Sequence, residues 1–227
     1  MMAGSDSGKR GLDSGMGGPA PKPADSERPI ALVGLMGAGK TAVGRLLAAR
    51  LGRPFADTDA LIEAEASCSI ADLFAREGEA AFRARERRWV ERIPVEMPGH
   101  VVALGGGMFV GEENVAQIRA SAIAVWLRAQ VDTLLERLGP AAAGGRPLLG
   151  GGDPRARLAA LLADRAPWYG RAHLVIDTDA RDAEAVAVAV AAAVAAALAV
   201  AAARGGTARS LDGFEGDGLE RDGRTRA

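Results

Sequence analysis

The stretch GLMGAGKT occupies residues 34–41 and matches the pattern G-x-x-x-x-G-K-[ST] in full. A short apolar run of strand type, 29–33, precedes it, and apolar residues recur at helical spacing over 41–51 after it. A strand, a glycine-rich turn and a helix in this order let backbone N–H groups surround phosphate oxygens at a helix N-terminus. A plain glycine-rich turn with a surface lysine is the alternative, and the flanking pattern argues against it. The stretch therefore predicts binding of a nucleoside triphosphate, with Lys40 at the β- and γ-phosphates and the Thr41 hydroxyl at Mg²⁺.

Composition narrows the class of protein. The 227 residues, 48% of them hydrophobic but only 4% aromatic, suit one domain whose core is built mainly from Ala, Val and Leu. A net charge of -1 gives no basic field for nucleic acid or anionic lipid, so we expect neither a nucleic-acid nor a membrane partner. The single cysteine, Cys68, excludes a disulfide within the chain and a cysteine-rich zinc site, which fits a reducing compartment.

The two ends of the chain differ in composition from its middle. Residues 1–28 are rich in Gly, Ser, Pro and Asp and lack an apolar signal-peptide core, and 204–227 are rich in Gly and charge, so we predict two disordered tails around a domain at 29–203. Residues 183–203 are nearly all Ala and Val, long enough to span a membrane. Glu184 and the i+4 spacing of its valines favour a closing helix of the domain instead.

Short apolar runs alternate with helical stretches through the middle of the chain. The strand candidates are 30–33, 54–56, 101–104, 122–127 and 174–176. Ser69 and Asp72 form a capping-box pattern that starts one helix, and Gly78 is expected to interrupt it. This alternation predicts an α/β fold, a three-layer α/β/α sandwich with a five-stranded, mainly parallel sheet.

The triplet Asp57-Thr58-Asp59 directly follows the second strand candidate. Ligands of open α/β sheets bind beyond the carboxyl ends of strands. One aspartate there can reach a hydrated Mg²⁺, and the other can orient or deprotonate an attacking hydroxyl. A helix N-cap is the alternative, since Asp59 precedes the helical stretch 60–66.

Three glycines, Gly105, Gly106 and Gly107, follow the third strand candidate. Their lack of side chains allows a ligand to approach the backbone closely, although a flexible turn is the alternative. No acidic residue ends this strand, which favours Asp57 for the metal role.

Arginines mark two further places. The run FRARERR at 82–88 reads as a solvated helix face, but Arg83 follows the apolar Phe82 and is placed to hold an anionic ligand group, as is Arg165. Residues 139–152, rich in Gly, Ala and Pro around Arg146, have the composition of a mobile lid whose arginine stabilises the transferring phosphoryl group. A long disordered loop is the alternative for that segment.

Taken together, these runs closely resemble the shikimate kinases, small monomeric members of the nucleoside monophosphate kinase group, over roughly 28–203. The motifs occur in family order: GLMGAGKT, DTD, FRARE, GGG, RPLL and RAPWY.

On the nucleotide side, the resemblance implies that the loop residues hold the phosphates of ATP. They are Gly37, Ala38, Gly39, Lys40, Thr41 and Ala42. Asp57 corresponds to the metal-side aspartate, acting through water, and Arg146 to the lid arginine that reaches ATP. Arg137 and Arg181 correspond to arginines at the adenine base.

On the substrate side, Asp59 corresponds to the aspartate that contacts the ring hydroxyls of shikimate and assists deprotonation. Arg83 and Arg165 correspond to the arginines that hold its carboxylate, and Gly106, within the triple glycine, to a backbone contact. The implied reaction is phosphorylation of the 3-hydroxyl of shikimate by ATP with Mg²⁺, in the aromatic amino-acid pathway of a bacterial-type cytoplasm. The alternatives are another small-molecule kinase, such as a gluconate kinase, and a non-catalytic nucleotide-binding regulator.

Overall fold

The computed structural model describes residues 27–139 and 153–203. Its centre is a five-stranded sheet with strand order β2-β3-β1-β4-β5, and every pairing in it is parallel. The strands are β1 (Ile30–Val33), β2 (Phe55–Asp57), β3 (Val101–Ala103), β4 (Ile123–Arg128) and β5 (Leu174–Asp177). The predicted α/β architecture is confirmed, and each strand lies within two residues of its predicted bounds.

The central strands are apolar on both faces because helices cover both sides of the sheet. All four residues of β1 are buried, as are the three of β3 and five of the six of β4. Strand β1 pairs with β3 through Ile30 and Val101 and with β4 through Ile30 and Ile123, so the core runs through the middle of the sheet.

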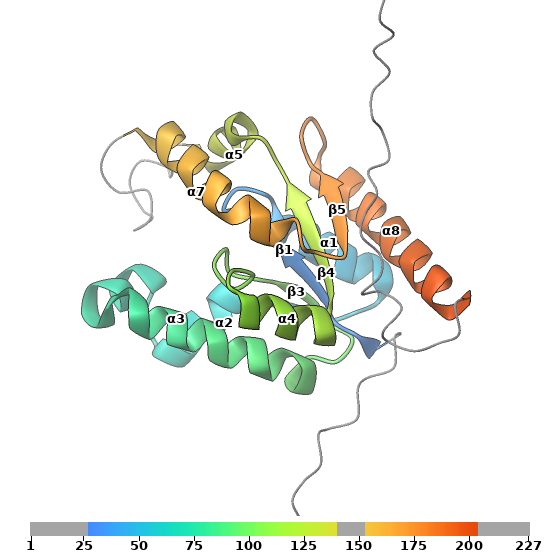
Figure 1. Ribbon diagram of the computed structural model, residues 1–227, viewed down its shortest axis with the longest axis horizontal. Coiled ribbons are helices and arrows are strands. Elements are labelled where there is room, and N and C mark those ends of the chain that lie inside the picture. The colour runs from blue at the N-terminus through green and yellow to red at the C-terminus, as the bar shows by residue number, and fades with distance from the viewer. Residues whose placement is uncertain (1–26, 140–152, 204–227) are drawn as a thin grey trace, which may run out of the picture.

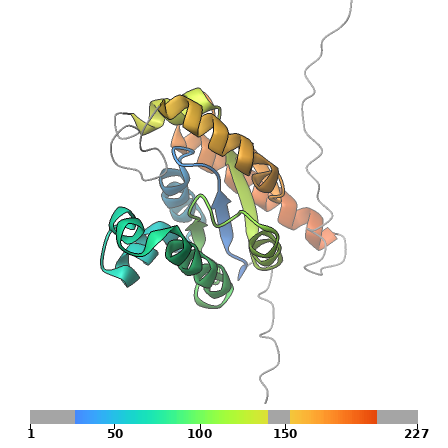
Figure 2. The same ribbon diagram turned by 60° about the vertical axis from the view of Figure 1, so that its left-hand side comes forward.

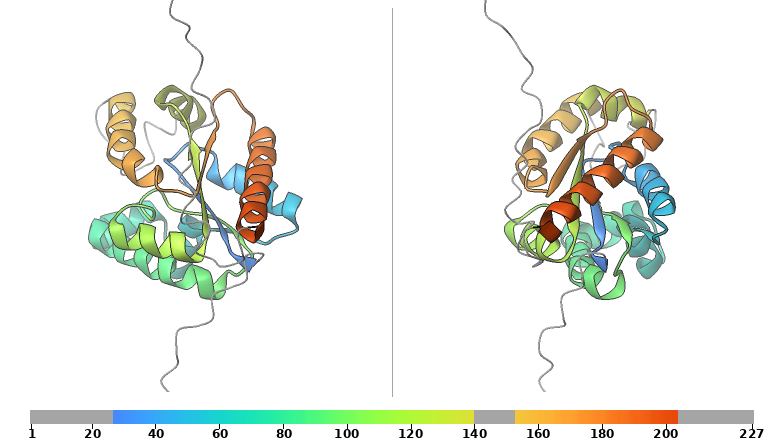
Figure 3. Two further views of the ribbon diagram at one scale, coloured as in Figure 1. Left: turned by 45° about the vertical axis from the view of Figure 1, so that its right-hand side comes forward. Right: turned by 90° about the vertical axis from the view of Figure 1, so that its right-hand side faces the viewer.

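Figure 1 shows the elements in place around this sheet. The helices are α1 (Lys40–Leu51), α2 (Thr58–Ala66), α3 (Ile70–Glu96), α4 (Glu112–Ser121), α5 (Val131–Leu138), α7 (Pro154–Tyr169) and α8 (Ala183–Ala203). Helices α1 and α8 cover one face of the sheet, and α3, α4 and α7 lie on the other side (Figures 2 and 3). The three-layer sandwich predicted from the sequence is therefore the observed arrangement.

Helix α3 carries the two local signals that the sequence predicted. The Ser69 side chain accepts a hydrogen bond from the Asp72 backbone N–H at 3.1 Å and caps the helix. Gly78 has φ 79° and ψ 172°, which breaks the helical path and turns α3 into two helices across a kink. The second part continues to Glu96, beyond the charged run.

Helix α8 has the length and apolar composition of a membrane span, with a mean hydropathy of 2.6 over its most apolar window. Its valines at i+4 spacing, Val186, Val190 and Val194, are nevertheless buried, because α8 packs on α1 and β5. Glu184 at its start accepts a hydrogen bond from Arg50 of α1 at 2.9 Å. The helix thus closes one face of the sheet, as its spacing predicted.

Arg28, which the sequence analysis assigned to the N-terminal tail, makes contacts within the described structure. The Arg28 side chain is buried, and its Nη2 donates hydrogen bonds to the carbonyl oxygens of Arg119 at 2.9 Å and Ala122 at 3.2 Å. Arg28 therefore joins the entry of β1 to the end of α4.

Candidate active site

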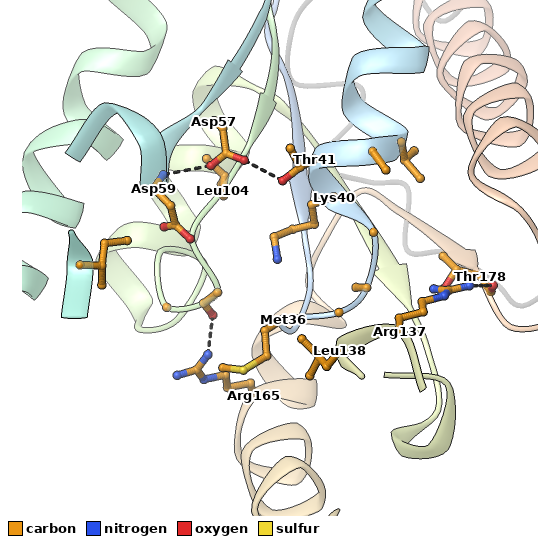
Figure 4. Close-up of a pocket in the computed structure, with 18 of the residues that line it drawn as sticks. Met36, Lys40, Thr41, Asp57, Asp59, Leu104, Arg137, Leu138, Arg165 and Thr178 are labelled. Carbon is orange, nitrogen blue, oxygen red and sulfur yellow. Dashed lines mark hydrogen bonds between the residues drawn. The ribbon is translucent and has the colours of Figure 1, made fainter. Parts of the chain in front are cut away.

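A cleft of about 830 Å³ opens at the carboxyl end of the sheet. Residues from the loop between β1 and α1 lie at its centre, with α2, α3 and α7 at one end and α5 and the β5–α8 loop at the other (Figure 4). This position follows from the parallel strands, whose carboxyl ends all meet at the same edge.

The loop GLMGAGKT forms the turn that its sequence predicts. Gly39 has φ 90° and ψ 13°, a left-handed conformation that suits glycine, and it is the N-cap of α1. Helix α1 therefore begins at Lys40, with its N-terminal N–H groups at the cleft. The Lys40 Nζ donates hydrogen bonds to the carbonyl oxygens of Gly34 at 2.9 Å and Leu35 at 3.2 Å. Gly37, Ala38 and Ala42 also line the cleft.

The Thr41 hydroxyl donates a hydrogen bond to Asp57 Oδ2 at 2.7 Å. Threonine hydroxyl and carboxylate are hard oxygen donors of the kind that Mg²⁺ takes alongside phosphate and water. Within residues 27–139 and 153–203 there is no cluster of three or more His, Cys, Asp or Glu side chains that could hold a metal. The Thr41 hydroxyl and the Asp57 carboxylate supply two oxygen donors of this kind, which suits a cation that also binds phosphate.

The two aspartates of the DTD triplet have different local roles. Asp57, at the end of β2, is the N-cap of α2, and its Oδ1 accepts a hydrogen bond from the Asp59 N–H at 3.1 Å. The alternative that Asp59 caps this helix is wrong, because α2 begins at Thr58 and Asp59 lies in its first turn. Asp57 points toward Thr41, whereas the Asp59 side chain points toward the triple glycine and the Arg165 end of the cleft (Figure 4).

Thr58, the middle residue of the triplet, is fully buried and joins α2 to β3. Its hydroxyl donates to the Ala103 carbonyl at 3.1 Å and accepts from the Gly105 N–H at 2.8 Å. The sequence analysis assigned no role to Thr58, and its place between two aspartates was the available signal.

The triple glycine allows three charged side chains to reach the backbone. A Cβ atom on Gly105 would lie 2.6 Å from Asp59 Oδ1, and one on Gly106 would lie 3.0 Å from Arg165 Nη1. A Cβ atom on Gly107 would overlap the Arg83 guanidinium. A side chain at any of the three positions would therefore occupy the space that Asp59, Arg165 or Arg83 now takes.

Arg83 is held at the cleft by two carboxylates of α3. It forms ion pairs with Glu86 at 2.6 Å and with Glu79 at 2.8 Å. Burial alone would lower the pKa of Arg83, but attraction to Glu86 and Glu79 outweighs it and raises the pKa, so the guanidinium stays charged. Glu86 is only 2% exposed, and its burial raises the pKa of that carboxyl although Arg83 opposes the shift.

Glu86 was missed by the sequence analysis. It belongs to the charged run 82–88, for which the sequence predicted a solvated face; of these residues only Arg87 and Arg88 are exposed, and Glu86 is buried. Its spacing of three residues from Arg83, and four from Phe82, was a signal that it shares their inward face.

Arg165 and Tyr169 lie one turn apart on α7 and bind the same atom. The Gly106 carbonyl accepts hydrogen bonds from Arg165 Nη1 at 3.0 Å and from the Tyr169 hydroxyl at 2.5 Å. Tyr169 is completely buried, and burial raises the pKa of its hydroxyl. The two donors hold the glycine loop in place, which the sequence analysis predicted for neither residue.

At the opposite end of the cleft, Arg137 reaches from α5 to the β5–α8 loop. Its Nη1 donates to Thr178 Oγ1 at 2.9 Å, and its Nη2 donates to the Thr178 carbonyl at 2.6 Å and to the Arg181 carbonyl at 3.3 Å. Arg181 also lines the cleft. Arg146 and the remainder of the predicted lid, 140–152, lie outside the described residues.

Comparison with known proteins identifies the family to which this geometry belongs. A family model described as shikimate kinase matches residues 36–195. The chain belongs to the shikimate kinase family. Among curated members, a shikimate kinase of Symbiobacterium thermophilum is 50% identical over 158 residues, covering 69% of this chain and 90% of that protein. One of Paramagnetospirillum magneticum is 47% identical over 158 residues, covering 70% and 80%.

Solved members of the family share the fold. A shikimate kinase from Acinetobacter baumannii in complex with shikimate superposes with a TM-score of 0.71 at 35% identity, covering 76% of this chain and 95% of that one. The shikimate kinase from Bacteroides thetaiotaomicron has a TM-score of 0.67 at 30% identity, covering 74% and 98%. The sequence's prediction of the family, and of an ATP-dependent phosphotransferase, is confirmed.

Proposed function

We propose that the enzyme transfers the γ-phosphoryl group of ATP to the 3-hydroxyl of shikimate, giving shikimate 3-phosphate and ADP. The observation that carries the proposal is one cleft with a phosphate loop at its centre and the buried or half-buried guanidinium groups of Arg83 and Arg165 at one end. Two guanidinium groups suit a small substrate with a carboxylate, and Asp59 beside them suits its hydroxyl groups.

The proposal gives a role to each predicted site residue. The N–H groups of the loop and Lys40 bind the phosphates, and Thr41 and Asp57 would hold Mg²⁺, which neutralises phosphate charge when bound. Arg83 and Arg165 hold the substrate carboxylate beside the Gly105–Gly107 backbone. Arg137 and Arg181, which line the α5 end of the cleft, are proposed to contact the nucleotide base, and Arg146 is proposed as the lid arginine.

In the transfer step, Asp59 accepts the proton of the 3-hydroxyl while that oxygen bonds to the γ-phosphorus. The bond from the γ-phosphorus to the β–γ bridging oxygen breaks, and ADP leaves. Catalysis of this kind is mostly positioning and charge neutralisation. We also propose that the protein acts as a monomer in the cytoplasm and supplies the aromatic amino-acid pathway.

The test is ADP release by the purified protein with Mg²⁺-ATP, alone, with shikimate and with gluconate. Strong stimulation by shikimate alone supports the proposal. Stimulation by gluconate alone would identify another small-molecule kinase. ATP binding without stimulation by either acceptor would contradict the proposal and favour a regulator.

Two variants separate the roles at the substrate end. Asp59→Asn should lower kcat by roughly 10²- to 10⁴-fold, the usual contribution of a general base. Arg83→Ala should raise the KM for shikimate by roughly 10- to 100-fold, because a charge-assisted hydrogen bond is lost. Arg85→Ala is the matched control, since Arg85 lies on the same helix but pairs with Glu77 and does not line the cleft. Normal turnover in Asp59→Asn would disprove the proposed base.

A further inference from the structure

Thr178 is the most deeply buried polar residue at the nucleotide end of the cleft, and the reaction as described does not use it. It is 1% exposed and directly follows β5. Its N–H donates to the Arg128 carbonyl at 2.9 Å, so the residue is tied to β4 beyond the last pair of the sheet. Thr178 is therefore tied to the sheet at the edge of the cleft.

Arg137 is anchored to Thr178. One terminal nitrogen of its guanidinium donates to the Thr178 hydroxyl, and the other donates to the Thr178 and Arg181 carbonyls. Figure 4 shows Arg137 beside Thr178. The donors of a guanidinium lie in its plane, so these bonds fix the orientation of the plane without covering its faces. An arginine side chain that is otherwise flexible gains a single orientation in this way.

The loop that supplies the carbonyls is itself fixed. The Arg181 N–H donates to the Thr178 carbonyl at 3.4 Å, and Asp179 accepts hydrogen bonds from the Gln130 N–H at 3.0 and 3.3 Å. Asp182 caps α8 by accepting from the Ala185 N–H at 2.7 Å. Among the described residues, the Thr178 hydroxyl is the only side-chain group that holds Arg137, so it can be removed by substitution.

We propose that Thr178 is a positioning residue that sets the plane of the Arg137 guanidinium and thereby strengthens binding of the nucleotide base. This inference rests on the proposed function, because it takes the α5 end of the cleft as the base end. It predicts that loss of the hydroxyl weakens ligands that carry a base and spares ligands that carry phosphate alone.

The experiment compares binding of Mg²⁺-ADP with that of Mg²⁺-pyrophosphate to the full chain. Thr178→Val keeps the shape of the side chain and removes its hydroxyl. The loss of about one hydrogen bond should weaken Mg²⁺-ADP roughly 3- to 10-fold and leave Mg²⁺-pyrophosphate unchanged. The KM for ATP should rise by the same factor while the KM for shikimate does not. Thr178→Ser, which keeps the hydroxyl, should bind Mg²⁺-ADP as the wild type does.

A double-mutant cycle decides whether Thr178 acts through Arg137. In an Arg137→Ala background, Thr178→Val should produce no further loss of Mg²⁺-ADP binding. Equal losses in both backgrounds, or parallel loss of Mg²⁺-pyrophosphate binding, would overturn the inference. If Thr178→Val does not fold, Thr178→Ala replaces it in the cycle. Thr133→Val, on the same helix as Arg137 but outside the cleft lining of the described residues, is the control and should change neither ligand.

Because both ligands are measured without an acceptor, the result does not depend on shikimate turnover. A wild type that fails to phosphorylate shikimate contradicts the proposed function. A cycle that is additive contradicts the role of Thr178 alone.

Discussion

At the scale of single residues, Glu86 shows how the site combines charge with burial. Its Oε2 pairs with Arg83, while its Oε1 is buried without a hydrogen-bond partner among the described residues. The Asp59 carboxylate is close enough to raise the pKa of Glu86 further, after burial itself. Burial of the Glu86 carboxyl costs desolvation free energy, and its ion pair with Arg83 holds that guanidinium at the substrate end of the cleft.

This arrangement makes the free energy of unfolding depend on pH in a particular direction. The pKa of Glu86 is raised in the folded state, whereas in the unfolded chain it lies at about 4.3. Between a pH of about 4.3 and the higher folded pKa, the folded state retains a proton that the unfolded state has lost. The free energy of unfolding of the wild type therefore falls as pH rises through this window.

Glu86→Gln remains neutral at every pH and lacks this fall. We therefore expect the free energy of unfolding of the variant, relative to that of the wild type, to increase as pH rises from 4 to 8. This holds whether the variant is more or less stable than the wild type at pH 4. Urea unfolding at several pH values measures the difference. Glu91→Gln, exposed on the same helix, is the control. A difference that stays constant or declines with pH would refute the assignment.

The residues found from the sequence are those whose chemistry is locally determined. Gly39 and Lys40 were predictable because a phosphate loop needs that backbone turn at a helix start, whatever surrounds it. Glu86 was not, because its burial depends on α7 and the glycine loop, which approach α3 only in the folded molecule. Thr178 was missed for the same reason, since its partner Arg137 is 41 residues away.

At the scale of elements, the start of α2 shows what positions the catalytic groups. Thr58 bonds to the Ala103 carbonyl and the Gly105 N–H, and thereby sets the distance between the DTD triplet and the triple glycine. The boundary of this helix was predicted two residues late, because Asp57 and Asp59 both satisfy the capping preference in the sequence alone.

Thr58→Val keeps the shape of the side chain but removes the buried hydrogen bonds to the Ala103 carbonyl and the Gly105 N–H. We expect the free energy of unfolding to fall by about 2 kcal/mol and Tm by about 4–8 °C, since each of the two hydrogen bonds contributes about 1 kcal/mol. Thermal unfolding followed by circular dichroism measures the change. Thr58→Ser keeps the hydroxyl and should recover most of the loss; a Thr58→Val protein as stable as the wild type would show that the link is dispensable.

At the scale of the whole molecule, packing of α8 on α1 and β5 completes one outer layer of the sandwich. Its composition alone is compatible with a membrane span, and only its periodicity indicates a packed face. The structure places Val190 fully inside against the core, whereas Val188, two residues earlier, is 42% exposed. These two valines on the same helix therefore test the packing directly.

Val190→Asp buries a carboxylate in the apolar layer between α8 and the sheet. We expect it to lower the free energy of unfolding by about 3 kcal/mol or more, whereas Val188→Asp should change it by no more than about 0.5 kcal/mol. A helix that crosses a membrane would disfavour both aspartates, because no face of it meets water. Urea unfolding and partition into detergent, measured on both variants, distinguish the two cases. If both variants were equally destabilised and the wild type entered the detergent phase, the closed sandwich would be contradicted. The two valines differ only when one face of α8 packs on the sheet and the other face is hydrated.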